Sequence, residues 1–204
     1  MKEFNIVVAG VGGQGILLAA EILGTAALKE ELNVRVSEIH GMAQRGGSVI
    51  SNIRIGEKVL APTILEGSAD VLLGFEPLET VRNLKFTSKS TLILMNDEPV
   101  SPLGLTTKMM SYPSLDEIAE KINGFTRNVV VVEAAELAKE AGSVLTRNAV
   151  LIGGLAATGK MPVRIESLKE AIRELVPAKY LEMNMKAFEL GYKDVQRKSR
   201  INVL

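Results

Sequence analysis

The chain has 204 residues, of which 47% are hydrophobic and 24% charged, and this size and composition predict one globular domain over residues 1–204. Lys and Arg together number 24, as do Asp and Glu, so no net charge attracts nucleic acid or an anionic membrane. Cysteine is absent and His40 is the single histidine, which excludes thiolate-bound zinc, cysteine-bound iron–sulfur clusters and multi-histidine metal sites on this chain.

The N-terminal residues do not fit a signal peptide, and no segment reaches the roughly 18 consecutive apolar residues of a membrane span. We therefore expect a cytoplasmic protein that holds no metal and contacts no membrane.

Short apolar runs alternate with helical patterns, which predicts an α/β fold: three α/β/α layers around a mostly parallel, Rossmann-like sheet. We expect strands at residues 5–9, 34–39, 48–55, 70–74, 91–95 and 129–132. We expect helices at residues 14–29, from 77 onward, and at 115–123, 134–142, 147–159, 165–175 and 179–197, so that the C-terminal section is helical. The first helix is apolar almost all round, and we expect it to be heavily buried against the sheet.

The segment AGVGGQG follows the first predicted strand and opens the first predicted helix. Gly10, Gly12 and Gly15 fit the pattern G-x-G-x-x-G in the context that this motif requires. Its glycines permit a tight turn and a close backbone approach, and the exposed N–H groups at a helix start favour a phosphate or a carboxylate. The alternative is a glycine turn that serves only the packing of strand against helix.

A dinucleotide site would also require an acidic residue about 20 positions further on, at the end of the second strand. Glu30 and Glu31 have about this spacing but fall at the end of the predicted helix, and Glu38 lies somewhat late. The glycine motif therefore favours an anion or a partner protein over NAD.

A second glycine-rich segment, HGMAQRGG, follows the second predicted strand, at the sheet edge where open α/β sheets bind ligands. Arg45 precedes Gly46 and Gly47, so its guanidinium has little crowding and can bind a phosphate or carboxylate in a bidentate manner. His40 titrates near neutrality and can exchange a proton. For His40 alone, a hydrogen-bonded structural role is the simpler interpretation, whereas the segment as a whole favours a functional site.

Three further polar residues follow predicted strands: Glu76, Asn96 and Glu133. In a parallel sheet they would line the same edge as the two glycine-rich segments. For Glu76, which precedes Pro77, a helix cap is an equally good interpretation.

Together these segments resemble a known family. AGVGGQG, then SEIHGMAQRGGSVISNIRIG, then APTILEGSADVLLGFEPLE are similar to successive motifs of the gamma-type module of 2-oxoacid:ferredoxin oxidoreductases. The similarity is most specific from residue 5 to residue 79 and continues more weakly to the C-terminal helices. The form HGMAQRGG favours the indolepyruvate branch of the family.

The resemblance implies a subunit of a heteromeric enzyme that converts indolepyruvate and related aryl 2-oxoacids, with coenzyme A, to aryl-acetyl-CoA and carbon dioxide and reduces ferredoxin. Thiamine diphosphate and the iron–sulfur clusters would belong to a large partner subunit, with none bound by this chain alone. The motif residues carried over are Gly10, Gly12, Gly13, Gln14 and Gly15, and then His40, Gly41, Gln44, Arg45, Gly46 and Gly47. We expect the two glycine-rich segments to bind cofactor or coenzyme A, and His40 and Arg45 are the candidates for a catalytic role.

Two other functions fit the same residues. One is a stand-alone NAD(P)-binding reductase, which the G-x-G-x-x-G pattern also permits. The other is a non-catalytic factor that only stabilises the large subunit.

Overall fold

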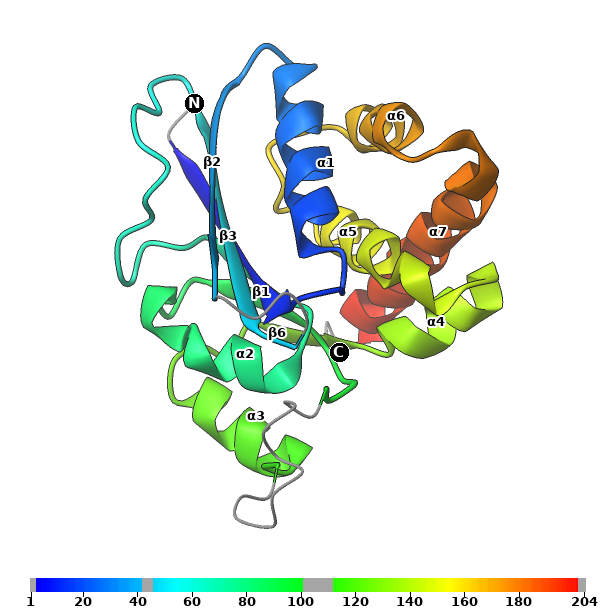
Figure 1. Cartoon of the computed structure of the whole chain (residues 1–204). Coiled ribbons are helices and arrows are strands. Elements are labelled where there is room, and N and C mark those ends of the chain that lie inside the picture. Colours follow the sequence, from blue (N-terminus) through cyan, green and yellow to red (C-terminus); the bar gives the residue numbers. More distant parts are fainter. Residues whose placement is uncertain (1–2, 42–45, 101–111, 202–204) are drawn as a thin grey trace.

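The computed structural model describes residues 3–41, 46–100 and 112–201 (Figure 1). Within these ranges a six-stranded sheet has the strand order β2-β3-β1-β4-β5-β6. The strands are β1 (Phe4–Val11), β2 (Asn33–His40), β3 (Ser48–Gly56), β4 (Val71–Gly74), β5 (Leu92–Asn96) and β6 (Val129–Val132).

The sheet is parallel from β1 through β4 and β5 to β6, whereas β3 runs antiparallel to both β1 and β2. The predicted α/β class is confirmed, and the sheet is mixed because of this one reversed strand. The reversal has a simple cause: residues 41–47 are too few for the crossover of a dozen or more residues that a parallel neighbour needs.

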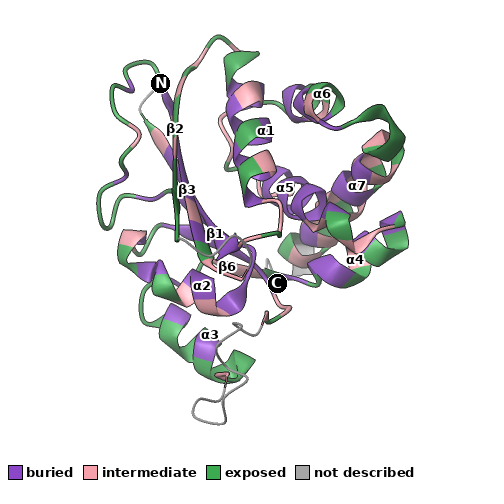
Figure 2. Ribbon diagram, in the orientation of Figure 1, coloured by how far each residue is buried: buried purple, intermediate pink, exposed green. Residues whose placement is uncertain are grey.

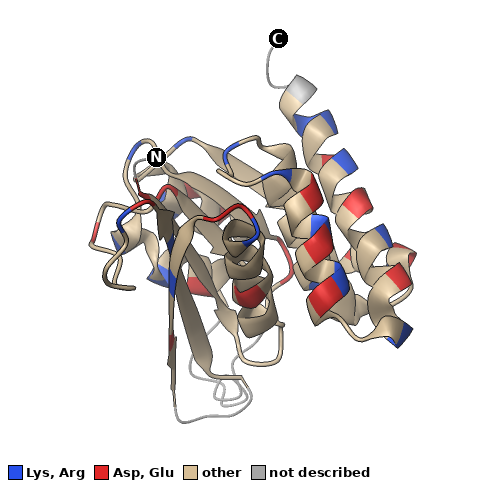
Figure 3. Cartoon of the chain, turned by 90° about the horizontal axis from the view of Figure 1, so that it is seen from above, with Lys and Arg blue, Asp and Glu red and all other residues tan. Residues whose placement is uncertain are grey.

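Helices cover both faces of the sheet, as predicted (Figure 1). One face carries α1 (Ile16–Leu28), α4 (Ala134–Ala141), α5 (Arg147–Ala157), α6 (Ile165–Leu175) and α7 (Ala178–Ile201). The other face carries the shorter α2 (Pro77–Arg82) and α3 (Leu115–Asn123). Short 3-10 helices lie at Leu84–Phe86 and Val144–Thr146. Basic and acidic residues alternate along the C-terminal helix from Lys179 to Asp194, whereas the charged residues of its last turns are all basic (Figure 3).

Two apolar cores lie on opposite faces of the sheet, and Figure 2 shows the burial of the central strands. Alternate residues of β1 divide between them: Ile6 and Val8 join the larger core under α1 and α5, while Val7 and Ala9 join the smaller core under α2 and α3. The central strands β4 and β5 are buried throughout, as expected for parallel strands covered on both faces.

In the larger core, α5 and α7 cross with their backbones in contact. A Cβ atom on Gly153 would lie 2.0 Å from the carbonyl oxygen of Phe188, and one on Gly191 would lie 2.0 Å from that of Val150. Glycine is therefore required at both positions for the helices to approach this closely.

Helix α1 is heavily buried against the sheet, as predicted. Its inner side, which includes Ala19 and Leu23, is fully buried, whereas Leu17 is 47% exposed and Leu28 is 60% exposed. This outer flank stays exposed because α1 lies over β2 and β3 at the end of the sheet and no described element lies beyond β2.

Within the described residues, no helix is long and apolar enough to cross a membrane.

Candidate functional site

The two glycine-rich segments lie at the same edge of the sheet. β2 and β1 point the same way because β3 runs antiparallel to both, so the chain leaves both strands at one end. The N–H of Gly12 donates a hydrogen bond to the carbonyl oxygen of Gly47, over 2.9 Å. The structure therefore brings the described parts of both predicted loops together. Gln44 and Arg45 lie outside the described residues.

The first loop favours glycine at three positions, Gly10 for lack of space and Gly13 and Gly15 for their backbone conformation. A Cβ atom on Gly10 would lie 2.7 Å from both Gln14 Oε1 and Phe75 Cβ, and Gly13 and Gly15 have φ of 99° and 81°. These are left-handed conformations that glycine adopts without strain. Gly15 is the N-cap of α1 and provides no capping side chain, so the first N–H groups of this helix face the loop uncapped.

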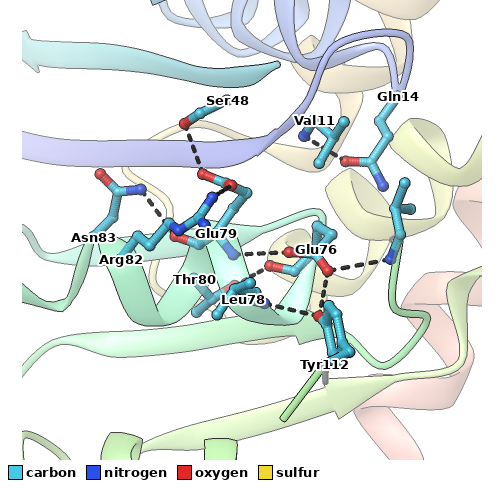
Figure 4. A network of polar contacts seen from close by, with 11 residues as sticks. Val11, Gln14, Ser48, Glu76, Leu78, Glu79, Thr80, Arg82, Asn83 and Tyr112 are labelled. Carbon is cyan, nitrogen blue, oxygen red and sulfur yellow. Dashed lines mark hydrogen bonds and ion pairs between the residues drawn. The ribbon is translucent and has the colours of Figure 1, made fainter. Parts of the chain in front are cut away.

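Gln14 braces the loop from within. Its Oε1 accepts a hydrogen bond from the N–H of Val11 (2.8 Å), and its Nε2 donates one to the carbonyl oxygen of Phe75 (3.1 Å) (Figure 4). Both polar ends of this side chain are thus used to join the end of β1 to the end of β4. The hydrogen bonds that the structure shows for Gln14 therefore stabilise the loop.

Asn148, at the start of α5, lies against the end of the first loop. The sequence motifs did not predict this residue. Asn148 is 3% exposed, and its Nδ2 would lie 3.1 Å from a Cβ atom on Gly15. Its Oδ1 accepts a hydrogen bond from the N–H of Ala149. Asn148 packs beside the N-terminus of α1 although it is far from the glycine motif in sequence.

His40, at the end of β2, is exposed. Among the described residues its ring makes one hydrogen bond, a 3.4 Å contact between Nδ1 and the carbonyl oxygen of Gly41. The structure thus gives no buried, firmly held histidine. Gly46 follows in a left-handed conformation with φ of 75°, and Gly47 provides the carbonyl oxygen that binds the first loop.

Glu76 is the hub of a buried network beside these loops (Figure 4). Its carboxylate is 1% exposed, and Oε2 caps α2 by accepting from the N–H of Glu79 (2.8 Å). The capping interpretation is therefore confirmed. Oε1 accepts from the N–H of Val100 and from the hydroxyl of Tyr112, which itself accepts from the N–H of Leu78. Burial and the hydrogen bond to Glu76 raise the pKa of Tyr112, so this hydroxyl remains a proton donor at neutral pH.

A second buried carboxylate, Glu79, joins α2 to the second loop. It is 3% exposed, accepts a 2.6 Å hydrogen bond from the hydroxyl of Ser48, and pairs with Arg82 at 2.5 Å. Ser48 begins β3 directly after the loop. Sequence reasoning missed Glu79, Ser48 and Tyr112 as a set, because only the folded sheet places them side by side.

Asn96 and Glu133 lie at the same edge, as predicted, at the ends of β5 and β6. Asn96 is fully buried; its Nδ2 donates to the carbonyl oxygen of Phe75 and its Oδ1 accepts from the N–H of Ala134, so it ties neighbouring strand ends together. Burial, with further contributions from Glu133 and Glu98, raises the pKa of Asp97.

This acidic end of the edge disfavours an anion. The end formed by β1 and β2, with its uncapped helix start, is the part suited to one. Among the residues that the structure describes, no group of three His, Cys, Asp or Glu side chains is placed to hold a metal ion.

The strand order also bears on dinucleotide binding. In a nucleotide-binding Rossmann unit the second strand adjoins the first, but here β3 separates β2 from β1. Glu30 lies at the far end of α1, where it accepts hydrogen bonds from the N–H of Arg164 and the hydroxyl of Ser167. It is therefore not available to hold a ribose beside the glycine loop.

Comparisons with known proteins agree with this fold. The chain belongs to the pyruvate ferredoxin/flavodoxin oxidoreductase family, whose model matches residues 5–194. The family resemblance drawn from the two glycine-rich segments is confirmed.

Individual relatives match along nearly their whole length. Indolepyruvate oxidoreductase subunit IorB of Pyrococcus horikoshii is 48% identical and that of Thermococcus kodakarensis 47% identical, each over 95% of this chain and 96% of the relative. The crystal structure of pyruvate oxidoreductase subunit PORC from Thermotoga maritima has a TM-score of 0.70 at 23% identity, covering 95% of this chain and 97% of that chain. At that identity the structural match supports the fold alone.

Proposed function

We propose that this chain is the small (beta) subunit of a cytoplasmic, heteromeric indolepyruvate:ferredoxin oxidoreductase. The complex would decarboxylate indolepyruvate and other aryl 2-oxoacids, transfer the acyl group to coenzyme A, release carbon dioxide and pass two electrons to ferredoxin. The observation that carries this proposal is the 47–48% identity, over 95% of the chain, to subunits named for indolepyruvate oxidoreductase.

The thiamine diphosphate and the iron–sulfur clusters belong, in this proposal, to a large partner subunit. The absence of cysteine is consistent with clusters that are ligated by the partner alone. In the proposal, this chain contributes to binding and not to the chemistry of the cofactors.

That contribution comes from the β1 and β2 end of the edge. The loop of Gly10, Gly12, Gly13 and Gly15 leads into α1, which begins there without a side-chain cap. In the proposal, Arg45 with Gly46 and Gly47 adds a guanidinium, and both loops face the partner's cofactor cleft. They supply positive potential to the phosphates of coenzyme A or thiamine diphosphate.

Arg45→Ala in the assembled enzyme tests this assignment. We expect the KM for coenzyme A to rise at least tenfold, because the variant loses a charge-assisted bidentate contact worth about 1.5–3 kcal/mol. Arg173→Ala, on the exposed side of α6, is the matched control and leaves this constant unchanged. If Arg45→Ala changes neither the KM nor the turnover, the binding role of the second loop is wrong.

The two other functions give different results. A reductase would bind NADH or NADPH tightly as an isolated chain, which the separation of β2 from β1 disfavours. A pure stabilising factor would leave the large subunit able to reduce ferredoxin at full rate on its own. We expect the large subunit alone to lose coenzyme A-dependent turnover.

A further inference from the structure

The β2 end of the sheet has an open edge. β2 pairs only with β3 in the described part of the chain, and its eight residues are exposed or half-exposed throughout. The edge of β2 opposite β3 is therefore free of strand pairing in the described part of the chain, although the Val34 carbonyl oxygen accepts a hydrogen bond from the Arg35 guanidinium. Natural edge strands are commonly short, kinked or covered, because an open edge invites pairing with another chain. β2 contains no proline and is longer than an average strand of about 5–6 residues.

A groove of about 360 Å³ runs beside this edge, between α1 and β2. Its apolar lining comes from Leu17 and Leu28 of α1 and from Val34 and Val36 of β2. Leu17, Leu28 and Val36 are each more than 40% exposed. Gly24 of α1 also lines the groove, and a Cβ atom there would make an ordinary contact of 3.5 Å with Val36 Cγ2. A strand added beyond β2 would place alternate side chains beneath the outer flank of α1.

The charge of the groove indicates which side chains a bound segment would present to it. Glu21 and Glu38 are its charged residues, and none of the residues that line it is basic. Neither carboxylate has an ion-pair or hydrogen-bond partner among the described residues, whereas the nearby Lys29 is paired with Glu174. An occupant with apolar side chains and a basic residue would complement this surface.

We propose that the outer edge of β2 and the groove between α1 and β2 bind an extended segment of the large subunit, which adds a strand antiparallel or parallel to β2 and carries apolar side chains with a basic residue. The inference rests on the proposed function, since it takes the large subunit as partner. β2 leads directly into the second glycine-rich loop, so a segment bound here would be continuous with the cleft that the loop faces. Main-chain hydrogen bonds would hold the segment, and Glu21 and Glu38 would select its basic residue.

Site-specific photo-crosslinking in the assembled enzyme tests the location. A benzoylphenylalanine at Val36 or Leu28 should crosslink to the large subunit, whereas one at Leu145, which is 79% exposed beside α5, should not. Crosslinks from Val36 and Leu28 to a second copy of this chain, or no crosslink from either position, would overturn the proposal.

A charge reversal tests the chemistry. The double variant Glu21→Lys, Glu38→Lys should weaken binding of the large subunit at least tenfold, while Glu182→Lys on the exposed side of α7 should not. The thermal midpoints of both variants report whether the chain still folds. If wild type and the double variant bind equally well, docking lies elsewhere; if the wild type binds no large subunit, the proposed function itself fails.

Discussion

The crossing of α5 and α7 and the groove between α1 and β2 each contain a largely apolar helix. That helix is covered at the crossing and partly exposed at the groove. Both α1 and α5 are apolar almost all round. α5 is buried from Asn148 to Ala156, because the sheet, α7 and α4 surround it and Gly153 and Gly191 let two backbones touch. α1 leaves a flank exposed because the sheet ends at β2. Composition therefore determines how much surface a helix can bury, whereas the number of neighbouring elements determines how much it does bury.

The largest expected effect on stability comes from a Gly→Ala substitution at the crossing, compared with the same substitution beside the groove. Gly153→Ala places a Cβ atom 2.0 Å from a backbone oxygen, so α5 and α7 must separate, and we expect the free energy of unfolding to fall by about 3 kcal/mol. Gly24→Ala makes only an ordinary contact with Val36 and should stabilise α1 by up to about 1 kcal/mol. Urea denaturation of the full chain measures both. Equal losses would show that α1 and β2 are packed as tightly as the crossing.

A smaller, pH-dependent effect on the free energy of unfolding is expected at Glu30. This residue follows α1 and links the end of that helix to the start of α6. Partial burial opposes ionisation, but the N–H of Arg164, the hydroxyl of Ser167 and the Arg164 charge outweigh it and lower the pKa of Glu30. A lowered pKa contributes stability above the unfolded value of 4.5, and this contribution is lost as the pH falls through the folded-state pKa.

Glu30→Gln should therefore cost about 1 kcal/mol at pH 7, like the loss of a helix cap, and progressively less in acid as wild type and variant converge. Denaturation midpoints measured from pH 7 down to pH 3 test this. Glu31→Gln, in the same turn, is the control and should leave the midpoint at pH 7 close to that of wild type. A difference between Glu30→Gln and wild type that is constant with pH would contradict the ionic contribution.

The smallest effect is expected in the groove itself. Val36 is 41% exposed, so Val36→Thr should change the stability of the isolated chain by less than about 0.5 kcal/mol. Val8→Thr, at a fully buried position of the same sheet, places a hydroxyl in the larger core and should cost at least about 1 kcal/mol. Thermal and urea unfolding compare the two variants. A similar loss from both would mean that the groove is closed in the isolated chain.

Local patterns predicted the elements well. The helices at residues 115–123 and 165–175 and the strand at 129–132 have the predicted bounds. Ser114 and Gly124 flank the first helix, Pro177 follows the second, and the strand is a run of four valines. The common edge of the two glycine-rich loops also followed from strand order in sequence. The antiparallel direction of β3 could also be predicted from the sequence, because the loop before it is too short for a parallel crossover.

The side chains that support the site could not be predicted in the same way. Ser48 meets Glu79 across 31 positions and Tyr112 meets Glu76 across 36. Taken alone, Ser48, Glu79 and Tyr112 each resemble an ordinary polar surface residue. Asn148 lies beside Gly15 only because α5 packs against the start of α1. These contacts arise from tertiary packing, which local periodicity does not encode.

The hydrogen bond between Gly12 and Gly47 joins two main-chain groups, an N–H and a carbonyl oxygen. Replacing any side chain between His40 and Gly46 leaves its donor and its acceptor in place. The second loop can therefore accumulate changes in sequence without losing its anchor on the first.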